Sequence, residues 1–392
     1  MRRPFDRPSA LLPVLVGSLA AVGVLMVFSA SAVFSRDVYG DSLHILKRQL
    51  FWLAAGIGFC LVGARVDYHR WRRWCRPLLL GGAGLLLLLF LPGLGRSGGG
   101  ARRWLSLGGF NFQPAELVKY LMIIYLADFL ARKQEVIAGF RRGFLPPLAV
   151  VTVLAALVVV QPDLGTALSL GAVGWAMLFL AGARIRHLLL PLLPALPGIA
   201  YLVWSKPYRV RRLVAFLDPW QDSRGAGFQI IQSLIALGSG GVTGVGLGES
   251  RQKLFYLPAA TTDFIFSILG EELGFLGAAA VLVLYAALIF TGFAIARQAA
   301  DLYGRLLALG IVLMLGLQAL VNMAVASSLL PTKGLPLPFI SYGGSNLICS
   351  FFGIGILLNI AAHRDRPCAA AAGLPDTLFL NRPTPKGGTD HE

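Results

Sequence analysis

Three carboxylates at the start and inside of one apolar stretch are the residues best suited to chemistry. The segment LPAATTDFIFSILGEELG, residues 257–274, places Asp263 before a hydrophobic run and Glu271 and Glu272 within it. Ionisable side chains inside a bilayer cost about 2.5–3.5 kcal/mol each, so they usually face a cavity or a partner. Asp263 is a candidate general base or, alternatively, the N-cap of the following helix. We expect Glu271 and Glu272 to be inward-facing structural partners.

Two other places combine charge with apolar surroundings. Glu116 and Lys119, in QPAELVKYL, lie three residues apart and therefore share one helical face. They form either a structural ion pair or part of a site, and the two roles are compatible. Asp163, in QPDLGT, is either a tight-turn residue or a candidate site residue.

Basic residues gather in the polar segments near these carboxylates. They are Arg102, Arg103, Arg209, Arg211, Arg212, Arg251, Lys253 and Lys333. Guanidinium groups match phosphate oxygens, so the cluster predicts a phosphate or pyrophosphate site; contact with anionic lipid headgroups is the alternative. A carboxylate base beside such cations suits transfer from a phosphate-activated donor to a hydroxyl. The glycine-rich stretch 238–248 lacks the Lys-Ser/Thr ending of a nucleotide-binding loop, and we interpret it as a flexible turn.

The apolar stretches that position these residues define the fold class. The chain has 392 residues, 56% hydrophobic and 14% charged, whereas soluble proteins carry about 25% charged residues. Apolar runs long enough to cross a hydrocarbon core of about 30 Å recur along it. The sequence therefore predicts an all-α polytopic membrane protein with about ten transmembrane helices. The predicted spans are 11–31, 49–64, 77–92, 114–130, 145–161, 164–182, 187–204, 263–295, 306–330 and 341–361.

The distribution of Lys and Arg predicts the orientation. Arginines concentrate in alternate short connections, which the positive-inside rule places in the cytoplasm, together with both termini. A signal peptide over residues 1–32 is the alternative for the first span. The predicted organisation is a cytoplasmic N-terminus at 1–10, a transmembrane domain at 11–362 with a long extracytoplasmic loop at 205–262, and a disordered cytoplasmic tail at 363–392.

Several other classes of function lack support in the sequence. The net charge of +16 fits the positive-inside pattern, and no nucleic-acid-binding motif accompanies it. The four cysteines are scattered, with no metal-binding spacing or disulfide framework. His44 is the only histidine in the predicted outer segments, so a serine-hydrolase triad is not expected there.

Several segments, in order and with matching spacing, resemble one membrane-protein family. They include FSASAVFS, RRWLSLGGFNFQPAELVK, QPDLGT, PYRVRRLVAFLDPWQD, GFQIIQSLIALGSGG, TDFIFSILGEELG and LLPTKGLPLPFISYGGS. Over about residues 11–361 the chain resembles the SEDS family (shape, elongation, division and sporulation). The FSAS, GLG and PTKG segments look more like the cell-division branch, with the elongation branch as the nearest relative.

The resemblance implies a peptidoglycan glycosyltransferase at the outer face of the cytoplasmic (inner) membrane. Such an enzyme polymerises lipid II into β-1,4 glycan strands with inversion and releases undecaprenyl pyrophosphate. The implied general base is Asp263, and the substrate-binding residues are Trp104, Glu116, Lys119, Arg209 and Arg212, joined by Lys333 from the basic cluster. Implied partners are a class B penicillin-binding protein, which is a transpeptidase, and other division-complex membrane proteins. Mg²⁺ or Mn²⁺ is the implied supporting ion.

The sequence also departs from the family pattern. Where the family usually reads LPEAHTDF, this chain reads LPAATTDF, so Ala259 and Thr261 replace the usual Glu and His. This departure makes a non-catalytic scaffold of the division machinery one alternative function. A flippase for a lipid-linked precursor is another, although the polar residues gather toward the outer end, which favours polymerisation.

Overall fold

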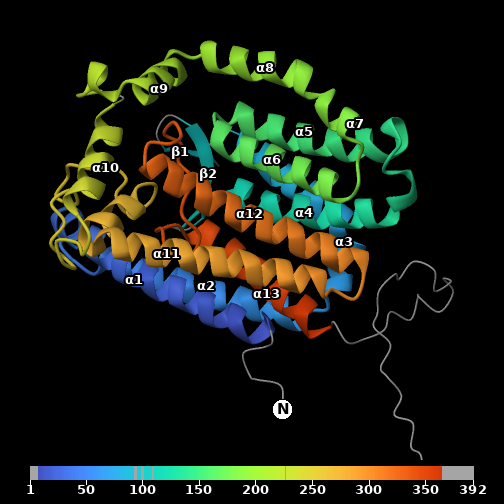
Figure 1. Ribbon diagram of the computed structural model, residues 1–392, viewed down its shortest axis with the longest axis horizontal. Helices are drawn as coiled ribbons and strands as arrows, with labels where there is room; N and C mark the ends of the chain where they lie inside the picture. The colour runs from blue at the N-terminus through green and yellow to red at the C-terminus, as the bar shows by residue number, and fades with distance from the viewer. Residues whose placement is uncertain (1–7, 92–94, 99–100, 108–109, 226, 364–392) are drawn as a thin grey trace, which may run out of the picture.

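The computed structural model describes residues 8–91, 95–98, 101–107, 110–225 and 227–363. These residues form a mostly helical body in which long helices lie side by side (Figure 1). Most of the predicted N-terminal segment 1–10 and nearly all of the predicted tail 363–392 lie outside the described residues.

Each predicted span coincides with a helix or with a consecutive helix pair. The helices are α1 (Pro8–Tyr39), α2 (His44–Arg65), α3 (Tyr68–Leu88), α4 (Pro114–Arg132), α5 (Leu145–Val160), α6 (Leu164–Leu180), α7 (Ile185–Leu189), α8 (Leu192–Trp204), α11 (Ile265–Arg297), α12 (Leu302–Ala326) and α13 (Gly344–Ala362). A π-helical turn, η3 (Phe140–Phe144), leads into α5, and a 3-10 turn, η2 (Gln134–Val136), precedes it. Within the described residues, seven of these helical stretches are long and apolar enough to cross a membrane. By contrast α6 has only 17 residues, and α3 and α4 carry several charged side chains.

The helix α4 occupies the centre of the body. It lies against α3, α6, α12 and α13, and most of its residues are buried, including Glu116, Lys119 and Asp128. A buried charge without a partner is costly. The buried charged side chains of α4 must therefore find their partners inside the protein.

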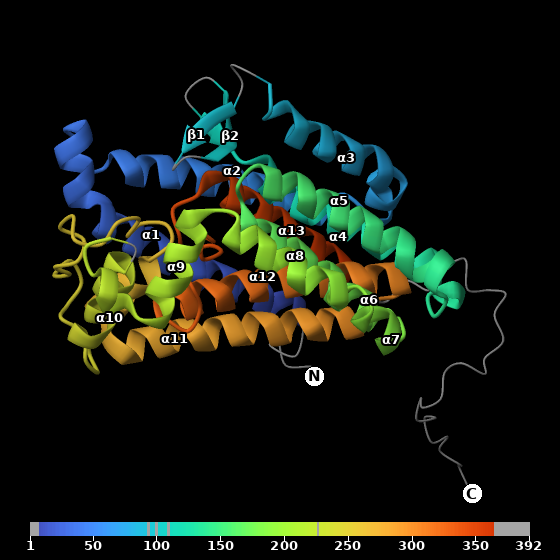
Figure 2. The same ribbon diagram turned by 90° about the horizontal axis from the view of Figure 1, so that it is seen from above.

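The expectation of an all-α chain was wrong in one segment. Residues of the glycine-rich connection before α4 form a small antiparallel sheet with strand order β1 (Gly95–Gly98), β2 (Ala101–Leu107), β3 (Phe110–Phe112). The sheet lies at the edge of the helical body, near the end of α5 (Figure 2). Frequent glycines depress strand propensity and concealed the alternating pattern of β2.

The predicted long loop 205–262 is partly helical. It contains α9 (Pro207–Leu217), a 3-10 turn η4 (Pro219–Asp222) and α10 (Phe228–Ser239), and together with α8 it arches over the body in Figure 1. Helix α10 buries Ile230, Ile231, Ser233 and Ala236. Its Ser233 hydroxyl lies 2.6 Å from the Ala326 carbonyl oxygen of α12, so α10 packs on protein.

Candidate active site

Asp263 lies in a turn immediately before α11. The N-cap of α11 is Phe264, with no side-chain cap, so the alternative of Asp263 as an N-cap was wrong. The turn closes instead on the carbonyl oxygen of Ala259, which accepts from the amides of Thr262 and Asp263 at 3.1 Å. No described residue donates a hydrogen bond or ion pair to the Asp263 carboxylate. The carboxylate is therefore available to a ligand.

The turn is fastened to the loop between α12 and α13. The side-chain amide nitrogen (Nδ2) of Asn322 donates to the backbone carbonyl oxygens of Asp263 at 2.9 Å and Leu335 at 2.7 Å. The hydroxyl of Ser341 donates to the carbonyl of Thr262 at 2.5 Å. These bonds hold two distant chain segments in one fixed arrangement around the carboxylate.

The loop from α12 to α13 presses its glycine against the carboxylate. A β-carbon on Gly334 would lie 2.9 Å from Oδ2 of Asp263, which is closer than ordinary contact. A larger residue at position 334 would have to displace this carboxylate. The preceding residue, Lys333, carries its ammonium into the same region, and burial lowers the pKa of that group.

Burial also changes the pKa of Asp263. It raises the pKa of the Asp263 carboxyl from 3.8 to about 6 because the ionised form loses solvation. The positive charges of Arg212 and Arg103 oppose that rise, whereas the negative charge of Asp163 adds to it. A carboxylate with this pKa is ionised at neutral pH and still a useful proton acceptor.

A cationic cavity opens beside Asp263. Its charged lining residues are Arg103, Asp163, Arg209, Arg212 and Lys333. They come from β2, the start of α6, α9 and the α12–α13 loop, which are far apart in the chain. Four cations against one lining carboxylate make the wall suitable for a phosphate-bearing ligand.

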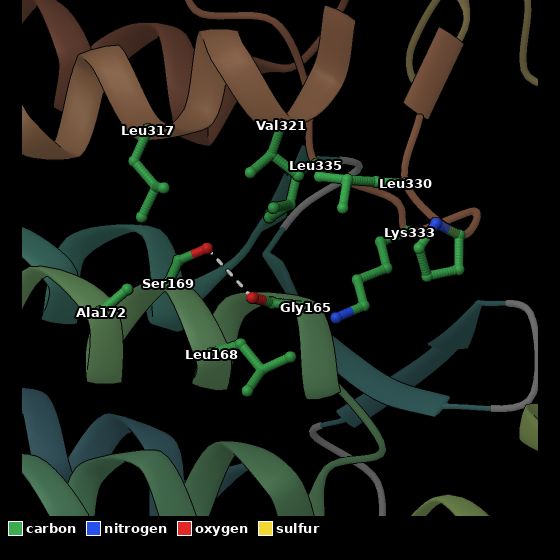
Figure 3. A pocket seen from close by; sticks show the side chains of 10 residues that line it. Gly165, Leu168, Ser169, Ala172, Leu317, Val321, Leu330, Lys333 and Leu335 are labelled. Atoms are coloured by element: carbon green, nitrogen blue, oxygen red, sulfur yellow. Dashed lines mark hydrogen bonds between the residues drawn. The ribbon is translucent and has the colours of Figure 1, made fainter. Parts of the chain in front are cut away.

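An apolar groove continues from this cavity between α6 and α12. Leu168 and Ala172 of α6 face Leu317 and Val321 of α12, and Lys333 reaches over the entrance (Figure 3). The Ser169 hydroxyl donates to the Gly165 carbonyl oxygen at 3.0 Å within the helix. With that group satisfied, the groove offers its occupant mainly hydrocarbon.

Arg103 and Asp163 form a polar corner of the cavity. The Asp163 carboxylate caps α6 by accepting from the Thr166 amide at 3.2 Å, which confirms the tight-turn interpretation. It also lies 4.0 Å from Nε of Arg103, whose Nη2 donates to the Pro162 carbonyl. The sequence analysis placed Arg103 in the basic cluster and kept Asp163 as a candidate site residue, but neither is among the substrate-binding residues that the family resemblance implies. In the sequence, the signal for this corner was Asp163, the acidic residue of QPDLGT.

The two predicted pyrophosphate arginines are not equivalent. Arg209 Nη1 donates to the Leu202 carbonyl at 2.6 Å, and its Nε donates to the Tyr208 hydroxyl at 3.0 Å. Arg212 forms no hydrogen bond with the described part of the chain, and it is the stronger electrostatic partner of Asp263. The geometry therefore leaves Arg212 free for a ligand and commits Arg209 largely to the α8–α9 corner.

The sequence profile of the FtsW/RodA/SpoVE family, described as cell cycle proteins, matches residues 9–366. The chain belongs to this family. It is 50% identical over 345 residues to the probable peptidoglycan glycosyltransferase FtsW of Geobacter sp. (strain M18), covering 88% of this chain and 94% of the relative. It is 44% identical over 356 residues to stage V sporulation protein E of Bacillus subtilis (strain 168), covering 91% and 97%. The resemblance to the SEDS family is confirmed.

Solved structures of FtsW/RodA/SpoVE proteins share the fold. A chain from a peptidoglycan synthase complex that coordinates polymerization and crosslinking superposes with a TM-score of 0.74 at 34% identity, covering 91% of this chain and 98% of that one. The rod shape determining protein RodA of Thermus thermophilus superposes with a TM-score of 0.65 at 29% identity, covering 91% and 97%.

The remaining predicted substrate-binding residues of this FtsW/RodA/SpoVE protein do not line the cavity or the groove. Glu116 and Lys119 form a buried ion pair of 2.8 Å within α4, and the Asn346 amide of α13 donates to Glu116 at 2.8 Å. This pair ties α4 to α13. Trp104 lies half-buried on β2, next to Arg103, with its side chain on the opposite face of the strand. As substrate-binding residues, all three stay predictions.

Glu271 and Glu272 anchor the segment before the active-site turn. Glu272 accepts from the Ser29 hydroxyl at 2.6 Å and lies 3.1 Å from Nζ of Lys253. Glu271 accepts from the Arg251 amide at 3.0 Å. Their interpretation as structural partners is confirmed, and their partners come from α1 and the α10–α11 connection.

Proposed function

We propose that this chain is a peptidoglycan glycosyltransferase of the division machinery, which polymerises lipid II and releases undecaprenyl pyrophosphate. One observation carries the proposal: the free Asp263 carboxylate stands beside a cavity walled by Arg103, Arg212 and Lys333. The FtsW relative at 50% identity, named a probable peptidoglycan glycosyltransferase, supports it.

Asp263 is the proposed general base. It takes the proton of the acceptor sugar's 4-hydroxyl, and that oxygen attacks the anomeric carbon of the lipid-linked donor. The new β-1,4 carbon–oxygen bond forms as the bond to pyrophosphate breaks, so the anomeric configuration inverts. With a pKa of about 6, Asp263 is ionised at neutral pH before the step and can hold the proton after it.

The cations of the cavity are proposed to bind the leaving pyrophosphate. Arg212 and Lys333 stabilise the negative charge that grows on it during bond breaking. Arg103, positioned by the Asp163 corner, adds a third charge. The apolar groove between α6 and α12 suits the polyprenyl chain that is attached to the same pyrophosphate.

A supporting Mg²⁺ or Mn²⁺ ion is proposed to travel with the pyrophosphate. The described residues contain no group of three acidic, histidine or cysteine side chains able to hold a metal ion. The site's two carboxylates, Asp163 and Asp263, face several cations, which do not favour a resident metal. Mg²⁺ typically needs few protein ligands when phosphates supply the others.

A ten-span topology with both termini in the cytoplasm completes the proposal. At 1.5 Å per residue α6 is about 25 Å long, close to a hydrocarbon core of about 30 Å. Its Asp163 end carries the cavity and is assigned to the outer face. Its other end leads to Arg184 and Arg186, which fits the cytoplasmic side.

A class B penicillin-binding protein is the proposed main partner, with other division proteins around it. The structural similarity to a chain of a peptidoglycan synthase complex, in which polymerization and crosslinking are coordinated, supports such a partner. Ala259, where the family usually has Glu, is exposed on the turn beside the active site. The side chain of residue 259 starts at the protein surface. We therefore propose that the replacement of Glu by Ala changes contact with a partner protein more than it changes the interior of the cavity.

The test is lipid II polymerisation by the purified protein with its class B partner. Wild type and the exposed control Asp37→Asn should form glycan strands, whereas folded Asp263→Asn should form none. Equal activity in all three would remove Asp263 from the mechanism. Failure of every variant with the partner bound would favour the scaffold, and translocation of labelled lipid II without strands would favour a flippase.

A further inference from the structure

A second charged cavity lies at the end of the helical body far from Asp263. It has a volume of about 610 Å³ and opens between η3 and α7. In Figure 1 α7 lies at the right of the body, and α10, beside the active-site turn, at the left. The charged and titratable residues that line this second cavity are Glu135, Arg141, Arg142, Arg184, Arg186 and His187.

The four arginines of this cavity have no acidic partner in the described part of the chain. Two other arginines at the same end of the molecule do have an acidic partner. Arg72 pairs with Asp128 at 2.9 Å, and Arg132 pairs with the same carboxylate. In the cavity, Glu135 is the single lining carboxylate. Four cations held this close attract a multiply charged anion.

His187 supplies an independent sign of a ligand. The residue is only 9% exposed, yet its Nδ1 is buried without a hydrogen-bond partner. The ring is held between Phe140 and Phe144, with centroid distances of 5.4 and 5.9 Å. Buried polar atoms are normally satisfied, and His187 is one of the residues that line the cavity.

Exposed apolar side chains flank the cations. Ile185 is 64% exposed and Leu189 57% exposed, and both lie on α7, which carries Arg186 and is preceded by its N-cap Arg184. Leu145, at the start of α5, is 43% exposed. Cations interleaved with exposed apolar groups at a helix end are typical of the membrane interface, where basic side chains meet anionic headgroups. A soluble anion would leave this apolar surface uncovered.

We propose that this cavity binds the headgroup phosphate of an anionic phospholipid in the leaflet at this end of the molecule. Arg184 and Arg186, with Arg141 and Arg142 opposite, hold the phosphate oxygens. His187 donates a hydrogen bond to one of them, and the acyl chains run along the exposed apolar residues of α7. The proposal is independent of the glycosyltransferase activity.

The direct test is binding of tail-labelled phosphatidylglycerol to the full-length protein in a neutral detergent, with phosphatidylcholine as the comparison lipid. Each arginine near a membrane surface contributes about a fivefold factor in affinity, so Arg184→Gln/Arg186→Gln should weaken binding about 25-fold. The matched control Arg70→Gln/Arg73→Gln removes two exposed arginines from the neighbouring start of α3 and should leave binding within about twofold. A phosphatidylglycerol-dependent change in the ¹⁵N signal of His187 should disappear in the first variant only.

Three results would overturn the proposal. Equal binding of the two lipids would mean that the headgroup charge is not recognised. Equal weakening in both double variants would reduce the effect to general surface charge. Displacement of the labelled lipid by micromolar soluble pyrophosphate would assign the cavity to a free phosphate compound.

Discussion

The contact between Gly334 and Asp263 gives the sharpest prediction about catalysis. Replacing Gly334 with alanine adds a β-carbon 2.9 Å from Oδ2 and 3.5 Å from Cγ of Asp263. The φ angle of Gly334 is not in the left-handed region, so the backbone accepts alanine without strain. The substitution therefore acts on the position of the carboxylate and leaves its chemistry intact.

The size of the effect follows from the distance. Relief of the contact to ordinary separation moves the carboxylate by about 0.5 Å. A displacement of about 1 Å at a reacting group can cost roughly 100-fold in rate, so half of that should cost roughly tenfold. We expect kcat for lipid II polymerisation to fall by about tenfold, which is about 1.4 kcal/mol in activation free energy, with the melting temperature unchanged within error.

The matched control is Gly171→Ala on α6, where a β-carbon meets nothing within 4 Å. Full activity in Gly334→Ala, equal to that control, would refute the idea that the loop sets the position of Asp263.

Three other outcomes follow from the same structure. Because Asp263 must be ionised, kcat/KM should rise with pH through about 6. Arg212→Gln should move that midpoint upward, because it removes a positive charge that lowers the pKa of Asp263. The pKa of Asp263 in the folded protein lies above 3.8, so in thermal melts its contribution to stability should decline as pH rises through about 6. Lys253→Met leaves Glu272 buried without its cation and should destabilise the fold by about 3–5 kcal/mol, with part of the loss recovered by Glu272→Gln; equal stability of wild type and Lys253→Met would contradict this. Ala259 has a φ of +57°, so Ala259→Gly should raise the melting temperature through relief of about 1 kcal/mol of backbone strain, and a lowered value would show that the alanine side chain is needed.

The helices and the catalytic turn could largely be predicted. Apolar length marked each span, and the TDF motif located Asp263 at the start of α11. The strands β1–β3 were missed because glycines mask strand propensity. The prediction left open whether Asp263 caps α11, since only the backbone path of the turn decides which carbonyl or side chain meets the first amides.

Other parts of the site depend on contacts that no local pattern reveals. Asn322 lies within an apolar helix, yet it joins the catalytic turn to the α12–α13 loop. His187 reads as an ordinary residue of a basic connection, whereas its buried and unpartnered nitrogen emerges only from the packing of Phe140 and Phe144 around it.

By itself, the sequence determined that this is a membrane protein of the FtsW/RodA/SpoVE family with a carboxylate at the mouth of an apolar helix. Hydrocarbon length and residue type are local properties, and they can be read without coordinates. Only the tertiary structure decided which charged groups act on Asp263. Arg103, Asp163 and Arg212 are far apart in the chain, and the pKa of Asp263 depends on their distances and on the water that packing removes.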